Sequence, residues 1–446
     1  MGVFKAYDIR GIYKEELDEA LAYRIGRNLP TLIGGKKVLV GRDARLSSPS
    51  LSKSLIEGLL DAGCDVDDVG FSSTPMIYFF TAEFNYDISI QVTASHNPAN
   101  YNGFKISKKG ALPVGYETGL AELEKACEKE CQPPSTLKGT LSQKNHIPDF
   151  LSFLDRFAPD LDGLRIVVDC SDGMGALTAK HLFEKCDATL IAATPDGGFP
   201  SHSPNPLEPA GRELITKTVL EQKADLGIIF DGDADRVMFI DENGAFVRPD
   251  LMIPIMASYF LRKYPNAPIL HDIRTSRGVT EALERMGAKP YIWKVGHAFA
   301  KVKLREIDAP YGGEYAGHYY FRDFHWCDSG ELASLIALGE IASAKKKGIS
   351  FSQLLKPIDS YANSGEINFR IEDKDGAIEK VISTLKGEAP PQRELDFDGI
   401  RLDYSDWWIS LRKSNTEPYL RLLLEAADER LLKERLTKVK ELLGQN

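Results

Sequence analysis

Three aspartates at alternate positions, Asp231, Asp233 and Asp235, directly follow an apolar run typical of a buried strand. Three carboxylates at one strand end repel one another unless a hard cation neutralises them, and oxygen ligands suit Mg²⁺ or Ca²⁺. The spacing also opens an EF-hand calcium loop, with Glu242 at its twelfth position, but the sixth position requires glycine and holds Arg236. We therefore expect a magnesium site and not an EF-hand. A solvated acidic turn is the weaker alternative, because Arg236 fits poorly in one.

Ser95 lies in a loop, Thr93–Pro98, that a strand expected over Asp87–Val92 delivers to the end of a sheet. The proline ends regular structure there, because its ring disfavours a helical residue before it. A serine held on such a loop, with His96 beside it and Lys105 ten positions on, suits covalent catalysis. We expect His96 to orient the loop. An ordinary polar turn is the alternative for this segment taken alone.

A glycine-flanked segment, Tyr311–His318, has the composition of a ligand-contacting loop. Its glycines allow the backbone to approach a ligand closely. Glu314, within the segment, can accept hydrogen bonds from two vicinal hydroxyls, as sugar recognition requires. A flexible hairpin tip explains the segment equally well.

A polar segment near the C-terminus joins two expected strands and brings together an arginine, two hydroxyls and an amide. With backbone N–H groups, these side chains suit a phosphate cradle. The alternative is a hairpin turn with a polar tip. The side chains are those of Arg412, Ser414, Asn415 and Thr416.

Taken together, the four segments resemble the phosphoserine, metal, sugar and phosphate loops of the α-D-phosphohexomutase family. They occur in the family's order and at its intervals, so the resemblance covers essentially the whole chain. Within the family, the chain is most similar to the bifunctional phosphomannomutase/phosphoglucomutase group. Further matches lie at Ala6–Gly11, Val40–Asp43, Pro204–Pro206 and Lys294–His297.

The resemblance implies a covalent mechanism. Ser95, as a phosphoserine, would supply the phosphoryl group and a fourth oxygen ligand to Mg²⁺ beside the three aspartates, and Arg236 would steady its oxygens. Hexose 1,6-bisphosphate is implied as an activator, and Arg10 as a further catalytic residue. Proton transfer falls to Lys105 or His297, and a lysine base needs a lowered pKa, which a neighbouring cation and arginines can provide. A structural histidine is the alternative for His297 alone.

The resemblance also implies a set of substrate contacts, two of which depart from the usual pattern. Ala316 stands where serine is common, and Arg274 where lysine is frequent. These departures concern the choice of sugar and leave the reaction class intact. The implied contacts are Glu314, Ala316, His318, Arg274, Arg412, Ser414, Asn415 and Thr416.

The composition limits the possible partners and compartment. The net charge of −10 argues against nucleic acid or an anionic membrane as a partner. The small phosphosugar that the resemblance implies is itself anionic, so its attraction must come from local arginines and lysines. No signal peptide or membrane-spanning run is recognisable, and the six cysteines are scattered, so we expect a cytoplasmic protein. The oligomeric state is left open between monomer and dimer.

The order of expected elements divides the chain of 446 residues into four domains. Strands that lead into polar loops alternate with amphipathic helices, which predicts mainly parallel mixed sheets covered by helices. After a linker near residue 357, consecutive strands with two helices predict an α+β unit. We expect three related α/β domains at 1–141, 142–244 and 245–357, and an α+β domain at 358–446, around a central active-site cleft.

The leading hypothesis is a magnesium-dependent phosphohexomutase that interconverts the 1- and 6-phosphates of mannose and glucose. A phosphoglucosamine mutase is the nearest alternative. A metal-dependent phosphatase is chemically adjacent, because water could take the phosphoryl group from Ser95. A non-catalytic sugar-phosphate sensor is the alternative from another class, and the retention of Ser95 and the three aspartates argues against it.

Overall fold

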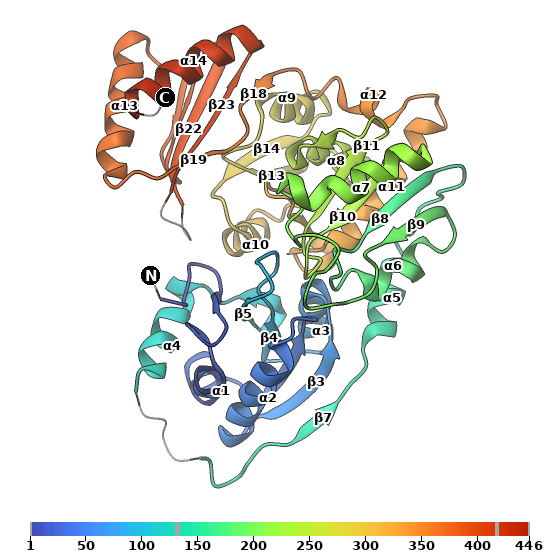
Figure 1. Cartoon of the computed structure of the whole chain (residues 1–446), viewed down its shortest axis with the longest axis vertical. Helices are drawn as coiled ribbons and strands as arrows, with labels where there is room; N and C mark the ends of the chain where they lie inside the picture. The colour runs from blue at the N-terminus through green and yellow to red at the C-terminus, as the bar shows by residue number, and fades with distance from the viewer. Residues whose placement is uncertain (1, 130–133, 415–418, 445–446) are drawn as a thin grey trace.

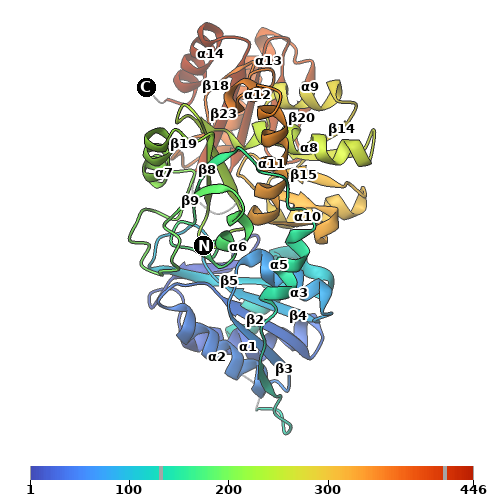
Figure 2. The ribbon, with the colours of Figure 1, turned by 90° about the vertical axis from the view of Figure 1, so that its right-hand side faces the viewer.

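A computed structural model describes residues 2–129, 134–414 and 419–444. It contains four sheets in chain order, each with its own helices (Figure 1). The predicted fold class, three α/β units followed by an α+β unit, is confirmed. Figures 1 and 2 place the helices of the fourth unit at the opposite end of the long axis from the first helices of the chain.

The first sheet carries the serine loop at the end of its β4 strand. Its strand order is β1-β5-β4-β2-β3-β7, with β2, β3, β4 and β7 running parallel and β1 and β5 antiparallel to their neighbours. The strands are β1 (Ile9–Ile12), β2 (Lys37–Arg42), β3 (Asp65–Phe71), β4 (Ile88–Val92), β5 (Tyr101–Lys108), β6 (Leu112–Pro113) and β7 (Leu141–Gln143). The helices are α1 (Glu19–Ile33), α2 (Ser48–Asp61), α3 (Thr74–Glu83) and α4 (Leu120–Cys127).

The second sheet carries the metal loop between β10 and β11. This loop is short, so β11 returns antiparallel to β10, whereas β8, β9 and β10 are parallel. The strands are β8 (Arg165–Asp169), β9 (Asp187–Ile191), β10 (Leu226–Phe230), β11 (Val237–Asp241) and β12 (Phe246–Val247). The helices are α5 (Ile147–Asp155), α6 (Ala176–Phe183) and α7 (Pro209–Gln222).

The third sheet repeats this arrangement with the sugar loop between β15 and β16. Again β13, β14 and β15 are parallel and the short hairpin makes β16 antiparallel. The strands are β13 (Pro268–Asp272), β14 (Lys289–Trp293), β15 (Tyr311–Gly313), β16 (Tyr319–Phe321) and β17 (Cys327–Asp328). The helices are α8 (Met252–Lys263), α9 (Arg277–Arg285), α10 (His297–Glu306), α11 (Gly330–Lys345) and α12 (Phe351–Leu355).

The fourth sheet is antiparallel in all of its described pairings. It has a hydrophobic core of its own, separate from those of the other units. The strands are β18 (Ala362–Asn363), β19 (Ile367–Phe369), β20 (Arg393–Leu395), β21 (Ile400–Asp403), β22 (Trp407–Lys413) and β23 (Leu420–Ala426), and the helices are α13 (Lys374–Glu388) and α14 (Glu429–Leu442).

Sheet pairing bears on the proposed domain limits. β7 adds to the first sheet and β12 to the second, so these sheets extend to Gln143 and Val247. We therefore propose that the first two units end after these strands and not at 141 and 244.

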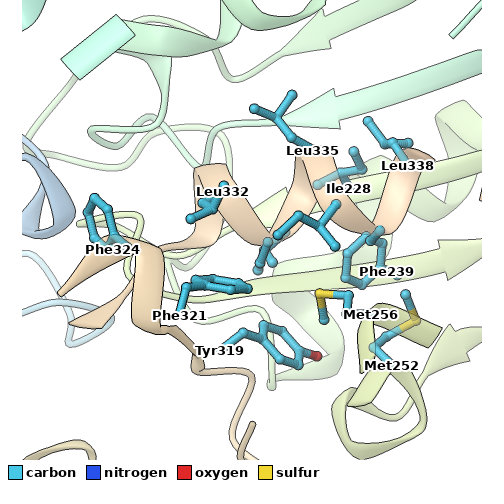
Figure 3. Packing of buried hydrophobic residues seen from close by; sticks show 14 of the residues in the cluster. Ile228, Phe239, Met252, Met256, Tyr319, Phe321, Phe324, Leu332, Leu335 and Leu338 are labelled. Atoms are coloured by element: carbon cyan, nitrogen blue, oxygen red, sulfur yellow. The ribbon is translucent and has the colours of Figure 1, made fainter. Parts of the chain in front are cut away.

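Helix α11 joins the second and third units through one continuous core. It is apolar on most sides, as expected for a helix buried on most of its surface. Figure 3 shows Leu332, Leu335 and Leu338 packed among Ile228 and Phe239 of the second sheet and aromatic and methionine side chains of the third unit. Helix α3 of the first unit contributes to the same core. The loops that these sheets carry are therefore held in a fixed relation to one another.

A buried histidine–carboxylate pair, His202 and Asp169, lies at the end of β8. The His202 Nε2 atom is 3.0 Å from a carboxylate oxygen of Asp169, and its Nδ1 atom is 2.8 Å from the carbonyl oxygen of Ser203. Both neighbours only accept hydrogen bonds, so both ring nitrogens donate and the imidazole is protonated. Burial lowers the pKa of His202, but the hydrogen bond and charge of Asp169 outweigh it and raise the pKa above 6.5.

His202→Gln is expected to lower stability by about 1 kcal/mol near pH 6, with a smaller deficit near pH 9. Because the folded-state pKa is raised, the contribution of the pair is fully present below about pH 6.5 and is lost as the pH rises through the folded-state pKa. Urea unfolding at both pH values measures the deficit. His181→Gln, in a more exposed pair with Asp155, is the control. Equal deficits at the two pH values would contradict a protonated His202.

Candidate active site

The metal loop holds three fully buried carboxylates. One oxygen each of Asp231, Asp233 and Asp235 lies within 4.8 Å of the other two. Arg236 donates to Asp231 through Nε at 2.8 Å. Among the described residues, one oxygen of Asp233 and one of Asp235 have no hydrogen-bond partner. Burial raises the pKa of Asp231 to about 6. Close, buried and partly unpartnered carboxylates fit a hard divalent cation.

Ser95 lies directly beside this loop, as the sequence predicts. Its hydroxyl donates to Asp231 Oδ2 at 2.9 Å and lies 3.2 Å from His96 Nδ1. The backbone of Ser95 is left-handed, with φ 51°. Arg45, a fully buried residue that sequence analysis missed, donates to the carbonyl oxygens of Ser95 and Asn97 at 2.8 and 2.6 Å. Arg45 therefore holds the serine loop in this strained turn.

Lys105 lies in the site, between two carboxylates of the metal loop. Its ammonium contacts Asp233 at 2.7 Å and Asp235 at 2.5 Å. Burial lowers the pKa of Lys105, but the aspartates outweigh this effect and the pKa lies above its ordinary value. Paired with these two carboxylates, Lys105 is a cation. The lowered pKa that a bound metal ion and arginines would give Lys105 stays a prediction.

Two histidines face the same region. The ring centroids of His297 and His318 are 5.8 Å apart. Burial is the main reason that the pKa of His297 lies well below its ordinary value. Burial also lowers the pKa of His318, but Asp235 and Asp328 outweigh it and raise the pKa. His297 is therefore the neutral member of the pair.

Asp328, which sequence analysis missed, connects His318 to a buried lysine. One oxygen of Asp328 lies 2.7 Å from His318 Nδ1, and the other lies 2.7 Å from the ammonium of Lys301. Asp328 and Lys301 are both fully buried. The carboxylate thus balances two cations, the ammonium of Lys301 and the imidazolium of His318.

The sugar loop places Glu314 at its base. The carboxylate accepts a 2.7 Å hydrogen bond from the Gly296 amide and a short one from the Tyr320 hydroxyl, and only 1% of Glu314 is exposed. Burial raises its pKa. Ala316 is half-buried two residues on and offers only a methyl group. The remaining oxygen lone pairs of Glu314 are the acceptors available to a hydroxyl.

The expected cations of the sugar and phosphate sites have acidic partners. Arg274 pairs with Asp272 at 2.9 Å and, across to the fourth unit, with Glu366 at 3.3 Å. Arg412 pairs with Asp398 at 3.1 Å. Ser414 follows β22, and its amide donates to the carbonyl oxygen of Tyr419. Asn415 and Thr416 lie outside the described residues.

Arg10 lies against the serine loop. It donates to Asn97 Oδ1 at 2.6 Å and pairs with Asp8 at 2.5 Å. These contacts place a guanidinium beside the loop of Ser95, where a phosphoryl oxygen would need a cation.

Thr74, also missed, ties the first unit to the metal loop. Its hydroxyl donates to Asp233 Oδ2 at 2.6 Å, and its amide donates to the Asp233 carbonyl oxygen at 3.0 Å. A local signal exists: Ser73 caps helix α3 and proline follows Thr74, which is typical of a helix that begins at a strand end.

Among the described residues, no helix is both long and apolar enough to cross a lipid bilayer.

Family models described as phosphoglucomutase/phosphomannomutase domains match the chain in order. Alpha/beta/alpha domain I matches residues 1–133, domain II 146–244, domain III 248–361 and the C-terminal domain 366–442. Each matched region contains one of the four sequence motifs.

Relatives match over the whole chain. An Escherichia coli protein named phosphomannomutase is 38% identical, with 99% of this chain and 98% of that protein covered. A Xanthomonas campestris pv. campestris protein named phosphohexose mutases is 37% identical, with 99% and 98% covered. The structure of a phosphoglucomutase/phosphomannomutase family protein from Burkholderia thailandensis superimposes with a TM-score of 0.89 at 31% identity, covering 99% of this chain and 96% of that one. The resemblance inferred from the motifs is confirmed, and the chain belongs to the phosphoglucomutase/phosphomannomutase family.

Proposed function

We propose that the chain interconverts hexose 1-phosphate and hexose 6-phosphate, with mannose and glucose phosphates as substrates. By family, the chain is a mutase, an enzyme of the isomerase class. The observation that supports covalent transfer best is the position of the Ser95 hydroxyl, 2.9 Å from Asp231 in a cluster of three buried carboxylates. A nucleophile placed beside a cation-binding cluster suits phosphoryl transfer.

Asp231, Asp233 and Asp235 would hold Mg²⁺, with an oxygen on Ser95 as a further ligand. When bound, the ion neutralises charge on the transferring phosphoryl group. Arg236, fixed by Asp231, would steady the oxygens of that phosphoryl group. Thr74 holds Asp233 in place from the first unit.

In the proposed step, the P–O bond to Ser95 breaks and a P–O bond to a sugar hydroxyl oxygen forms. The hydroxyl proton passes to a base, and the Ser95 oxygen leaves as an alkoxide that takes a proton. His297 suits the base, because burial keeps it neutral. Lys105 suits charge stabilisation as a cation, and His318, paired with Asp328, suits proton donation.

The product of this step is a hexose 1,6-bisphosphate, which must turn round to return its other phosphate to Ser95. A distal site must therefore accept a phosphate at either end of the sugar. We assign this site to Arg274, to Arg412 near the end of β22, and to Ser414 in the loop that follows. We propose that Asn415 and Thr416 complete it. A trace of hexose 1,6-bisphosphate would phosphorylate Ser95 and start the cycle.

We propose that the chain acts on a small phosphosugar in the cytoplasm, and that it binds neither nucleic acid nor a membrane. The net charge of −10 supports this proposal because it disfavours polyanionic partners.

Phosphate-transfer assays test the proposal. The purified protein, with Mg²⁺ and a trace of glucose 1,6-bisphosphate, is given the 1-phosphates of mannose, glucose and glucosamine, and products are followed by ³¹P NMR. Turnover of the mannose and glucose phosphates is expected to exceed that of glucosamine 1-phosphate by about tenfold or more. The reverse order would identify a phosphoglucosamine mutase, predominant inorganic phosphate a phosphatase, and binding without turnover a sensor.

A further inference from the structure

A turn of the fourth unit, residues 396–399 between β20 and β21, links two parts of the proposed active site. It lies against Arg412 on one side and against the loop before His297 on the other. Sequence analysis assigned no role to this turn. The inference below rests on the proposed function, because it concerns how the distal-phosphate site is held.

The first contact is with the arginine of the distal-phosphate site. Asp398 Oδ2 is 3.1 Å from an Nη atom of Arg412, whose side chain is only 4% exposed. Gly399, at φ 71°, approaches so closely that a Cβ there would lie 2.6 Å from Arg412 Cγ. Among the described residues, Arg412 Nε has no hydrogen-bond partner. The turn thus fixes the guanidinium and leaves a buried donor available for an anion.

The second contact is with the third unit. The same Asp398 Oδ2 accepts a 2.7 Å hydrogen bond from the Val295 amide. Phe397 stacks on Trp293, with ring centroids 5.9 Å apart. Val295 and Trp293 lie just before His297, the first residue of α10, which Figure 1 shows between the fourth sheet and the first unit.

The next amide along this loop is held by the sugar site. Gly296 donates to Glu314 at 2.7 Å, so consecutive amides are bound by a carboxylate of the fourth unit and one of the sugar loop. At φ 126°, Gly296 packs on Tyr7 of the first unit, and a Cβ would lie 2.6 Å from its ring. The conformation of this loop is therefore determined jointly by the fourth unit, the sugar loop and the first unit.

We propose that Asp398 is a positioning residue that fixes Arg412 and the Val295–His297 loop relative to each other. The carboxylate sets the orientation of the arginine that receives the distal phosphate. Through its hydrogen bond with the Val295 amide, the carboxylate also fixes the position of that arginine relative to His297 and Glu314. A simpler role, in which Asp398 only offsets the charge of Arg412, predicts the opposite effect on binding, because removal of the carboxylate would then strengthen the attraction for phosphate.

Asp398→Asn and Asp398→Ala test the proposal. Both are expected to raise KM for glucose 1-phosphate by about tenfold or more. Only the alanine variant is expected to lower kcat markedly as well, since asparagine retains an acceptor for Val295. Asp375→Asn, in an exposed pair with Lys413, is the control and should match the wild type. Unchanged or lowered KM values in the Asp398 variants would overturn the proposal.

A double-mutant cycle with Arg412→Ala gives the decisive readout. If Asp398 orients Arg412, Asp398→Asn should add little to KM in the Arg412→Ala background, whereas additive effects would overturn that role. Calorimetric binding of glucose 1-phosphate repeats the comparison without turnover. A wild-type protein that neither binds nor converts hexose phosphate would refute the proposed function, and an active wild type with an unaltered Asp398→Asn variant would refute this inference alone.

Discussion

Ser95→Ala is expected to lower kcat by about 10³-fold or more, because the covalent route through the serine oxygen is lost. The protein should keep its fold, since among the described residues the hydroxyl bonds only to groups of the site, and Arg45 holds the loop through backbone carbonyls. Steady-state kinetics with glucose 1-phosphate and Mg²⁺ measures the loss. Ser383→Ala, which removes an exposed hydroxyl on α13, is the control.

The binding of substrate should survive this substitution. The assigned phosphate and sugar contacts lie on other loops, so the affinity for glucose 1-phosphate should change by less than about threefold. A Ser95→Ala variant with near wild-type turnover would contradict the covalent mechanism.

Asp233→Asn is expected to raise the Mg²⁺ concentration at half-maximal rate by about 10- to 100-fold and to lower kcat as well. The substitution removes the charge of one of the three buried carboxylates. This carboxylate also pairs with Lys105 and accepts a hydrogen bond from Thr74. Titration of Mg²⁺ against rate, and of Mn²⁺ against protein by electron paramagnetic resonance, measures the effect. The second readout does not depend on turnover.

Two further variants serve as comparisons for Asp233→Asn. Glu314→Gln should raise KM for the sugar phosphate with an unchanged Mg²⁺ requirement, because it removes charge from a hydroxyl acceptor away from the metal loop. Asp375→Asn should leave both quantities unchanged. If Asp233→Asn showed the wild-type Mg²⁺ dependence, the assignment of the aspartates would be wrong.

The features best predicted from the sequence are those that depend on short, local sequence patterns. The metal loop follows an apolar strand at fixed spacing, and Ser95 follows an alternating strand closed by proline; the structure brings both loops together. The mixed sheets of the three α/β units, covered by helices, are confirmed as well. Their antiparallel pairings arise where the chain turns back on itself, at β5 after β4 in the first unit and after β10 and β15 in the second and third.

The partners of the site residues were not predictable in the same way. Asp328, Lys301 and Asp398 are charged residues without a local motif, and each acquires its role from a contact that the tertiary fold creates. The partners of Lys105 were not predictable for the same reason. Its environment is set by Asp233 and Asp235, more than a hundred residues away in the chain.

The central claim is that Ser95 carries the transferred phosphate, and mass analysis of the peptide containing Ser95 tests it most directly. The protein is incubated with glucose 1,6-bisphosphate and Mg²⁺, digested and mapped, and a second sample is chased with excess glucose 6-phosphate before digestion. The account predicts one phosphate on Ser95 in the first sample. In the chased sample that phosphate should be lost, with the bisphosphate appearing in solution. A peptide that never carries phosphate, or one that keeps it while the enzyme turns over, would contradict the mechanism.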